Sequence, residues 1–400
     1  MTVDANAGAE GYGIQPVHPR ATVIRALQAA EKGVLLSERS ERHTSGAEAH
    51  ADSTGVIPGI NPRPTAHGSF PAACLAPASL KADVQLPLAV IILGPTGSGK
   101  TALSLELAER FNGEIVSCDS VAVYRGMELG TAKPSAEERA RVPHHLIDVT
   151  TPDVPFTAGE YSRQARAALC DITGRGKMPI VTGGTGLYLR ALTEGLFDGP
   201  ARQEGLRARL NRSRARHGDA WLHRVLSRLD PGSAARIHGN DAAKLMRAIE
   251  VCLAARKPMS TLLADKAAAR DPLTGFQLLR IGLNPPRKAL YERLNRRAAA
   301  MFADGLVEET RGLLEAYGQV KALDSLGYRQ ALAVEAGTLS IADATTAAQQ
   351  GHRNYAKRQL TWFRREPDVH WLELFGDDPE AVRTAASLIA SLTLGEGRQS

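Results

Sequence analysis

Short apolar runs alternate with amphipathic stretches from about residue 86 onward. The runs span four to seven residues, which suits buried strands, and the stretches between them repeat their apolar residues at helical spacing. This order is typical of an α/β fold, in which crossover helices on both faces connect the strands of a mostly parallel sheet. The strand candidates are residues 88–93, 114–117, 145–149, 179–182, 277–283 and 369–374.

Strand signals are missing between about 197 and 270, where Arg, Ala and Leu predominate. Because this stretch interrupts a regular α/β order, we predict an all-helical subdomain at 197–270. It would be inserted into a core formed by residues 85–196 and 271–395. A second helical region, within the core, is expected from Pro285 to about Arg365.

Residues 1–84 have a different composition, rich in Ala, Gly, Ser, His and Pro, with turn-forming pairs such as Pro58-Gly59. We predict a mostly disordered extension with one helix candidate at 21–38. An upstream extension without any function is the alternative. No chemistry is assigned to it.

The overall composition is that of an ordinary soluble protein, with 43% hydrophobic and 23% charged residues among 400. No apolar run approaches the roughly 20 residues that cross a bilayer, and the first residues lack a secretory pattern. Cys74, Cys118, Cys170 and Cys252 form no C-x-x-C pair. We therefore expect neither a zinc cluster nor a disulfide framework, and a cytoplasmic location. The net charge of +6 mildly favours a polyanionic partner.

The clearest motif follows the first strand candidate and has the form G-x-x-x-x-G-K-[ST]. Its glycines allow the backbone to turn N–H groups toward anionic oxygens, and the helix expected at 101–111 points its positive end at the same place. The lysine adds a charge and the threonine a hydroxyl ligand for Mg²⁺. The motif predicts a phosphate or diphosphate site formed by Gly94, Pro95, Thr96, Gly97, Ser98, Gly99, Lys100 and Thr101.

Asp119 follows the second strand candidate. Ligands of open parallel sheets bind at the carboxyl ends of the strands, so Asp119 is expected near the phosphate loop. There a carboxylate could bind magnesium or accept a proton, and it could equally cap the following turn. The residues alone leave these possibilities open.

A second magnesium carboxylate is weakly supported. P-loop ATPases place an Asp at the end of another apolar strand, whereas the candidate 179–182 ends in Gly183, Gly184, Thr185 and Gly186. Only Asp148 could serve instead. The glycines could admit a ligand or simply make a strand-to-helix turn.

Basic residues gather in two regions. Arg207, Lys244 and Arg247 lie in the predicted insertion, and Arg287 follows it. Lys244 and Arg247 are three apart and share a helix face, for which a solvated surface is the ordinary explanation.

The segment 352–365 predicts an amphipathic helix without any acidic residue. Arg353, Lys357 and Arg364 form a basic stripe suited to a phosphate backbone. The opposite stripe, which can dock on the core, consists of Ala356, Leu360 and Phe363.

Taken together, these motifs resemble the tRNA dimethylallyltransferase family. The matching segments extend over about 86–375 and keep the family order, which makes the resemblance far more specific than the phosphate loop alone. The segments are 94–101, 117–134 (Ser-Cys-Asp-Ser through Thr-Ala-Lys-Pro), 144–148 (His-His-Leu-Ile-Asp), 183–192 (starting Gly-Gly-Thr-Gly), 326–330 (Leu-Gly-Tyr-Arg-Gln) and 356–364 (starting Ala-Lys-Arg-Gln). A zinc-finger tail like that of eukaryotic members is lacking, so the bacterial type is expected.

The resemblance implies a P-loop kinase-like core with a helical insertion and two substrates. The donor would be dimethylallyl diphosphate, and the acceptor the adenosine just 3′ of the anticodon in tRNA. Lys100, Thr101 with Mg²⁺ and Arg287 would stabilise the leaving diphosphate, and Asp119 would be the general base for the exocyclic amine.

The resemblance also implies contacts to the tRNA anticodon stem-loop. They map onto Asp119, Ser120, Val121, Ala122, Thr185, Arg207, Lys244, Arg247, Gly327, Tyr328, Arg329, Arg353, Lys357 and Arg358. Position 122 is Ala where many relatives have Gln, so a side-chain contact to the base is missing there. We expect a monomer with no membrane partner.

Three other interpretations compete with this one. An adenylate isopentenyltransferase would use the same donor on a free nucleotide, but would not need the insertion or the basic stripe. A small-molecule kinase would need a better second magnesium carboxylate. A non-enzymatic RNA-binding protein with a relict loop would not need Lys100 and Asp119 together.

Overall fold

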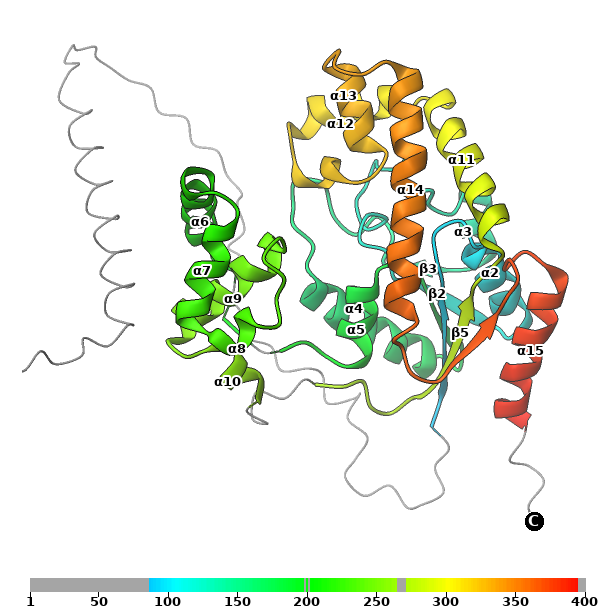
Figure 1. Ribbon diagram of the computed structural model, residues 1–400. Coiled ribbons are helices and arrows are strands. Elements are labelled where there is room, and N and C mark those ends of the chain that lie inside the picture. The colour runs from blue at the N-terminus through cyan, green and yellow to red at the C-terminus, as the bar shows by residue number, and fades with distance from the viewer. Residues whose placement is uncertain (1–85, 198, 201, 265–270, 395–400) are drawn as a thin grey trace, which may run out of the picture. The chain divides into compact units, whose positions relative to one another are not determined.

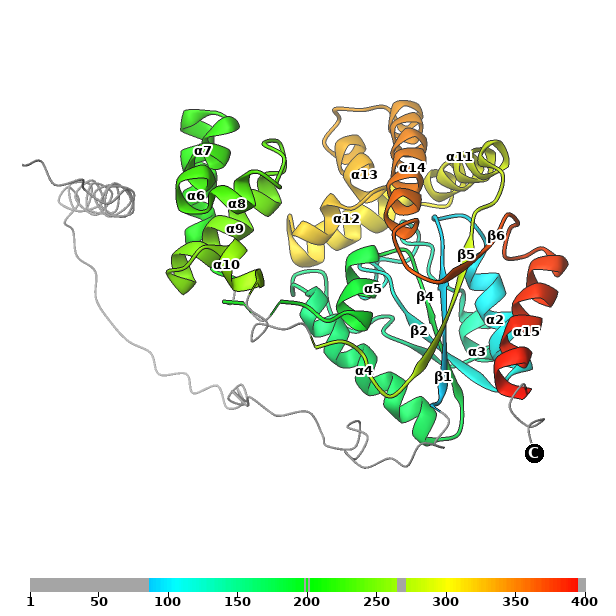
Figure 2. The ribbon, with the colours of Figure 1, turned by 60° about the horizontal axis from the view of Figure 1, so that its bottom comes forward.

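A six-stranded parallel sheet forms the core of the computed structural model, which describes residues 86–394 except 198, 201 and 265–270. The strand order is β3-β2-β4-β1-β5-β6, so β1 lies in the middle of the sheet between β4 and β5 (Figure 2). The predicted α/β class with a parallel sheet is confirmed. The strands are β1 (Leu88–Leu93), β2 (Gly113–Ser117), β3 (His144–His145), β4 (Met178–Thr182), β5 (Gln277–Leu283) and β6 (Val369–Leu372).

Helices cover both faces of this sheet. Val90 and Ile92 of β1 point to one face, where they share a core with α2 (Lys100–Arg110) and α15 (Pro379–Leu394). Ile91 and Leu93 point to the other face, covered by α4 (Ala158–Gly174) and α5 (Gly186–Thr193). The two helix layers stand on opposite sides of the strands in Figure 2. A continuous apolar run in β1 is therefore explained by burial of both its faces.

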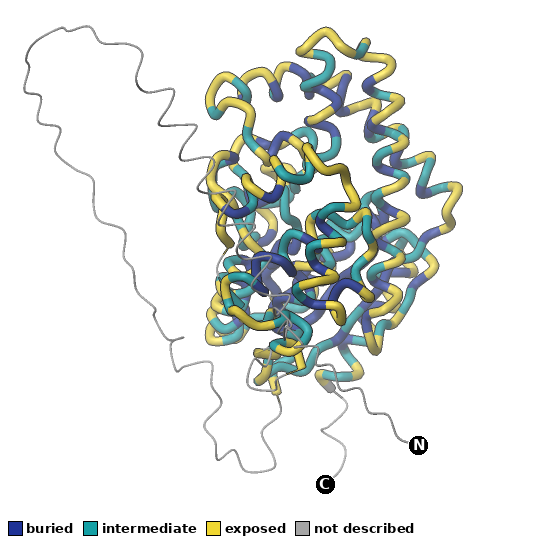
Figure 3. The backbone as a smooth tube through the Cα atoms, turned by 60° about the vertical axis from the view of Figure 1, so that its left-hand side comes forward, coloured by how far each residue is buried: buried dark blue, intermediate teal, exposed yellow. Residues whose placement is uncertain are grey.

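The helices that follow β5 pack on one another over a separate apolar cluster that includes Met301, Phe302, Leu306, Leu323 and Tyr328. The longest of them, α14, runs alongside α11 (Figure 1). Along such helices buried and exposed residues alternate, as expected for amphipathic elements (Figure 3). The elements are α11 (Arg287–Ala303), α12 (Leu306–Tyr317), the 3₁₀ helix η3 (Lys321–Asp324), α13 (Tyr328–Glu335) and α14 (Ile341–Phe363).

The described residues between 199 and 264 form a compact helical unit without a strand. Its own core contains Leu210, Leu222, Leu226, Leu245 and Ile249, which are all buried. The insertion boundaries 197–270 stay a prediction, and the helix candidate at 21–38 lies outside the described residues. The helices of the unit are α6 (Glu204–His217), α7 (Ala220–Leu229), α8 (Pro231–Ala234), α9 (Ala242–Ala255) and α10 (Met259–Ala264).

The predicted strands match the observed ones to within two residues at each end, except at the edge strand β3. Residues 145–149 were expected to be extended, but β3 is His144–His145, and Leu146 and Asp148 have φ of 63° and 56°. The backbone turns there because the Asp148 side chain binds Lys133 and Arg139, which lie on the preceding segment. A short helix, α3 (Ala136–Arg141), completes this edge.

Cys118 and Cys252 are buried thiols. Among the described residues, no helix has the length and apolarity to span a membrane.

Candidate active site

The phosphate loop connects the carboxyl end of β1 to the first turn of α2. Gly97 and Gly99 have φ of 79° and 88°, in the left-handed region that glycine tolerates, and Gly99 is the N-cap of α2. Lys100 and Thr101 form the first helical turn. Amides of a first turn have no acceptor within the helix, so they point into the loop together with the positive end of the helix dipole. The loop therefore has the geometry of an anion site.

Lys100 lies folded across this loop. Its Nζ donates hydrogen bonds to the carbonyl oxygens of Gly94 (3.0 Å) and Pro95 (2.8 Å). Burial lowers the pKa of Lys100 to about 8; the charge of Asp119 acts in the opposite direction, while that of Arg297 adds to the lowering. A bound anion would favour the protonated amine.

Asp119 follows β2 and stands within electrostatic reach of Lys100. Its Oδ1 accepts hydrogen bonds from the backbone N–H groups of Val121 (2.8 Å) and Ala122 (3.2 Å). Asp119 thus caps the turn, which was one of the possibilities left open by the sequence. Capping fixes one carboxylate oxygen and leaves Oδ2 without a hydrogen bond from the described residues, so a proton-accepting role remains compatible with this geometry.

The turn after β4 lies beside Asp119. The Ser120 N–H donates to Thr185 Oγ1 (3.0 Å), and the Thr185 N–H donates to the carbonyl of Cys118 (3.1 Å). A Cβ on Gly183 would stand 2.2 Å from the same carbonyl oxygen. The glycine therefore permits close approach of two strand ends, and the predicted contact residues Ser120 and Thr185 are brought together. Ala122 is buried.

Arg297, which the sequence analysis did not select, reaches the phosphate loop from α11. Its Nη1 donates to Thr96 Oγ1 (3.3 Å), and burial lowers its pKa while Asp119 raises it. The sequence contains a signal for this residue. Arg297 falls three residues after Leu294 and four before Met301, on the helix face that these apolar residues bury. An arginine on the buried face of a helix usually has a polar partner inside the protein.

Arg287, the predicted diphosphate arginine, lies at the first residue of α11 and is exposed. Its Nε donates to the hydroxyl of Tyr291 (2.9 Å), and its guanidinium stacks 5.1 Å from that ring. α11 begins just after the carboxyl end of β5, and the loop follows the carboxyl end of the parallel neighbour β1. In this structure Arg297 binds the loop and Arg287 does not.

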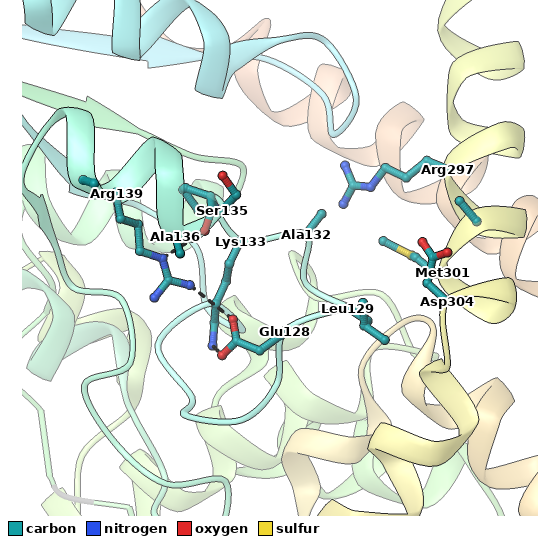
Figure 4. A pocket seen from close by; sticks show the side chains of 13 residues that line it. Glu128, Leu129, Ala132, Lys133, Ser135, Ala136, Arg139, Arg297, Met301 and Asp304 are labelled. Carbon is teal, nitrogen blue, oxygen red and sulfur yellow. Dashed lines mark hydrogen bonds and ion pairs between the residues drawn. The ribbon is translucent and has the colours of Figure 1, made fainter.

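A cavity of about 820 Å³ adjoins Arg297. Figure 4 shows the Arg297 side chain projecting from α11 toward the segment that carries Glu128 and Lys133. Lys133 donates to Glu128 (2.9 Å) and Asp148 (2.5 Å), and Arg139 donates to Asp148 (2.7 Å). Asp148 was the one alternative for a second magnesium carboxylate. In this structure each of its carboxylate oxygens is paired with a cation.

Only part of the basic stripe of α14 is exposed to an external ligand. Lys357 and Arg364 of the stripe are exposed, as is the neighbouring Arg358, whereas Arg353 is half-buried and donates to Asn295 and Gln350. On the opposite side Ala356 and Phe363 are buried as predicted, with Leu360 half-buried. The exposed cations Lys357, Arg358 and Arg364 are therefore those best able to meet an external anion.

Tyr328 was predicted to contact tRNA, but its side chain is fully buried. Its hydroxyl donates to Glu309 (2.5 Å), and its ring packs against Gly130, where a Cβ would stand 2.3 Å away. Tyr328 is thus a core residue here, because the apolar cluster under α12 and α13 requires a large side chain. Its neighbour Gly327, with φ of 94°, caps α13, and Arg329 is exposed.

In the helical unit, the predicted cations are bound by acids. Arg207 and Arg247 donate to the buried Glu250, each at 3.0 Å, and Gln203 N–H donates to the same carboxylate. Although burial opposes it, these hydrogen bonds lower the pKa of Glu250 to about 2. Lys244 is exposed and pairs with Asp241. Leu245 and Ile249 lie on the buried face of α9.

Comparisons with known proteins agree with one another. The model of the family described as IPP transferase matches residues 122–366. A tRNA dimethylallyltransferase of Koribacter versatilis is 64% identical over 76% of this chain and 98% of its own length. One from Solibacter usitatus is 52% identical, again over 76% of this chain and 98% of its own length.

Solved structures give the same result. The tRNA isopentenylpyrophosphate transferase of Bacillus halodurans is 35% identical, with a TM-score of 0.56 over 77% of this chain and 97% of that chain. A eukaryotic dimethylallyltransferase described as acting on tRNA is 26% identical, with a TM-score of 0.62. The match covers 76% of this chain and 78% of that chain.

Proposed function

This chain belongs to the IPP transferase family, and on that basis we propose that it is a tRNA dimethylallyltransferase. It transfers a dimethylallyl group from dimethylallyl diphosphate to the exocyclic amine of the adenosine 3′-adjacent to the anticodon, forming N6-isopentenyladenosine and diphosphate. The observation that carries the proposal is the combination of an anion loop after β1 with a carboxylate after β2, which is separated from β1 in the sheet by β4.

The donor diphosphate binds the loop. First-turn amides of α2 and the ammonium of Lys100 face its oxygens, and the Arg297 guanidinium lies on the other side of Thr96. Charge accumulates on the leaving diphosphate as the bond from C1 to oxygen breaks, and these groups stabilise that charge. Arg287, at the first residue of α11, would join them by leaving Tyr291.

The residues present fit a magnesium ion held mainly by the substrate. Thr101 places a hydroxyl at the first turn of α2, and the described residues contain no cluster of three acidic, histidine or cysteine side chains. Mg²⁺ commonly keeps several waters and binds through substrate phosphates and a few protein oxygens. When bound, it would neutralise charge on the diphosphate.

Asp119 acts on the acceptor. Its Oδ1 is fixed by the turn, which orients Oδ2 for the exocyclic amine of a flipped adenine. The amine attacks C1 of the prenyl group, and its proton passes to the carboxylate. Ser120 and Thr185, which are joined to each other, border the same place.

The RNA approaches along exposed cations. Lys357 and Arg358 on α14 and Arg329 on α13 are exposed in the core unit, and Lys244 is exposed in the helical unit. Arg207 and Arg247 would contact phosphate only through groups not used by Glu250. We expect the enzyme to act as a monomer in the cytoplasm, where its tRNA substrate occurs.

One experiment tests the function against its rivals. The protein is incubated with labelled dimethylallyl diphosphate and either tRNA, AMP or no acceptor, and separately with labelled ATP and candidate small acceptors. Label is expected in tRNA only. Label in AMP would support the adenylate transferase, phosphate transfer from ATP would support a kinase, and binding of tRNA without any transfer would support the non-enzymatic protein.

A further inference from the structure

We propose that Gln359 is a positioning residue that holds the donor loop and the acceptor-side turn in one fixed arrangement. The inference rests on the proposed function and concerns a side chain of α14 that faces away from the RNA-accessible cations. Gln359 is only 5% exposed, although it lies between the exposed Arg358 and the half-buried Leu360.

Both ends of the Gln359 amide are used. Its Oε1 accepts a hydrogen bond from the Thr96 N–H in the phosphate loop (2.8 Å), and its Nε2 donates one to the carbonyl of Gly184 (2.8 Å). One side chain thus joins three segments that are far apart in the sequence. Two buried hydrogen bonds to backbone groups fix an amide more strictly than apolar contacts do.

The glycines of the acceptor-side turn fit around α14. A Cβ on Gly184 would stand 2.2 Å from Gln359 Nε2, and a Cβ on Gly186 would stand 2.3 Å from the Trp362 ring. This answers the question left open by the sequence, because Gly184 and Gly186 give space to two side chains of α14. Arg190 of α5 stacks 4.7 Å from the same Trp362 ring and extends the contact.

The segments joined by Gln359 carry the two halves of the site. Thr96 belongs to the donor loop and is also bound by Arg297, while Thr185 follows Gly184 and binds Ser120 beside Asp119. Transfer requires the prenyl carbon and the amine nitrogen to meet at a defined distance, and small misplacements of reacting groups cost large factors in rate. Gln359 sets the distance between the loop and the carboxylate side.

Only a carboxamide of this length meets both demands. Glutamate lacks the N–H that Gly184 requires, asparagine is one methylene shorter, and methionine has the shape but neither hydrogen bond. Gln359→Met is therefore the most informative variant. Gln349→Met is the matched control, since Gln349 lies on the same helix and donates one hydrogen bond to the Asn295 carbonyl, away from the loop.

The test compares wild type, Gln359→Met and Gln349→Met by three measurements. Inorganic pyrophosphate is titrated by calorimetry at one pH, the dissociation constant for tRNA is measured separately, and steady-state transfer gives kcat and KM for the donor. Gln359→Met is expected to weaken pyrophosphate binding about tenfold and to lower kcat/KM for the donor at least tenfold. Its tRNA affinity should stay within twofold, and the control should match wild type in all three.

A double-mutant cycle tests the bridge directly. Gly184→Ala should reproduce the loss seen in Gln359→Met, because its methyl group displaces Nε2. In the Gln359→Ala background the same change should have little further effect. If Gln359→Met does not fold, the Gly184→Ala comparison still decides the matter, since that variant keeps the Gln359 side chain.

Wild-type pyrophosphate affinity and donor KM in Gln359→Met would overturn the proposal. So would a loss shared equally by the donor and tRNA measurements, which would indicate general damage to the fold. Failure of the function itself looks different, since wild type would then bind pyrophosphate without transferring a prenyl group to tRNA.

Discussion

Donor binding should weaken above about pH 8, because the pKa of Lys100 is lowered to about 8. The perturbation is pH alone, applied to the wild-type protein without tRNA. Below pH 8 the ammonium is mostly charged and can bind the diphosphate, while above it the amine is mostly neutral. The affinity for the diphosphate is therefore highest below the pKa of Lys100 and falls as the pH rises through it.

The magnitude follows from the protonated fraction. About nine tenths of Lys100 is charged at pH 7 and about one tenth at pH 9, so affinity should fall roughly ninefold between them, or about 1.3 kcal/mol. The donor's terminal phosphate loses its last proton near pH 6, and burial raises the pKa of Cys118 to about 12. Neither group therefore titrates between pH 7 and 9.

Isothermal titration with dimethylallyl diphosphate from pH 6.5 to 9.5 measures this profile. At pH 9 binding should also take up close to one proton, which appears as a dependence of the heat on the buffer. Lys100→Arg is the control, because arginine stays charged throughout. A flat affinity between pH 7 and 9 in wild type, or the same slope in Lys100→Arg, would refute the reasoning.

Three further changes test separate parts of the site. Asp119→Asn keeps the turn-capping oxygen and should leave tRNA affinity unchanged while lowering kcat by about 10² to 10⁴; unchanged kcat would remove Asp119 from proton transfer. Lys357→Gln should reduce the slope of log affinity against log salt for tRNA by about one, whereas an unaltered slope would mean a merely solvated lysine. Glu250→Ala leaves Arg207 and Arg247 without their buried partner and should lower the free energy of unfolding by about 3–5 kcal/mol in denaturant titrations. A loss below about 1 kcal/mol would contradict that role of Glu250.

Much of the fold could be predicted because its signals are local. The strands β1 and β5 have the bounds that the sequence indicated, and in β1 burial of both faces selects an unbroken run of apolar residues. The phosphate loop was equally clear, because glycines at fixed spacing are needed for its positive φ angles. The position of Asp119 at a strand end followed from its place in the sequence, just after the second strand candidate.

Other parts of the site depend on contacts between distant residues. Arg297 meets Thr96 across 201 positions and Gln359 meets the same residue across 263. No spacing rule reveals which side chain crosses to the loop. The shorter β3 has the same origin, because Asp148 turns the chain to reach two cations.

By itself, then, the sequence determined the sheet, the anion loop and the carboxylate beside it, since periodicity and backbone freedom act over a few residues. Only the tertiary structure decided which cations are free. In that structure Arg207 and Arg247 form ion pairs with Glu250. Tyr328 is buried in the core, and Lys357 is exposed. The physical reason is that charge pairing and burial depend on neighbours in space, and folding chooses those neighbours from the whole chain.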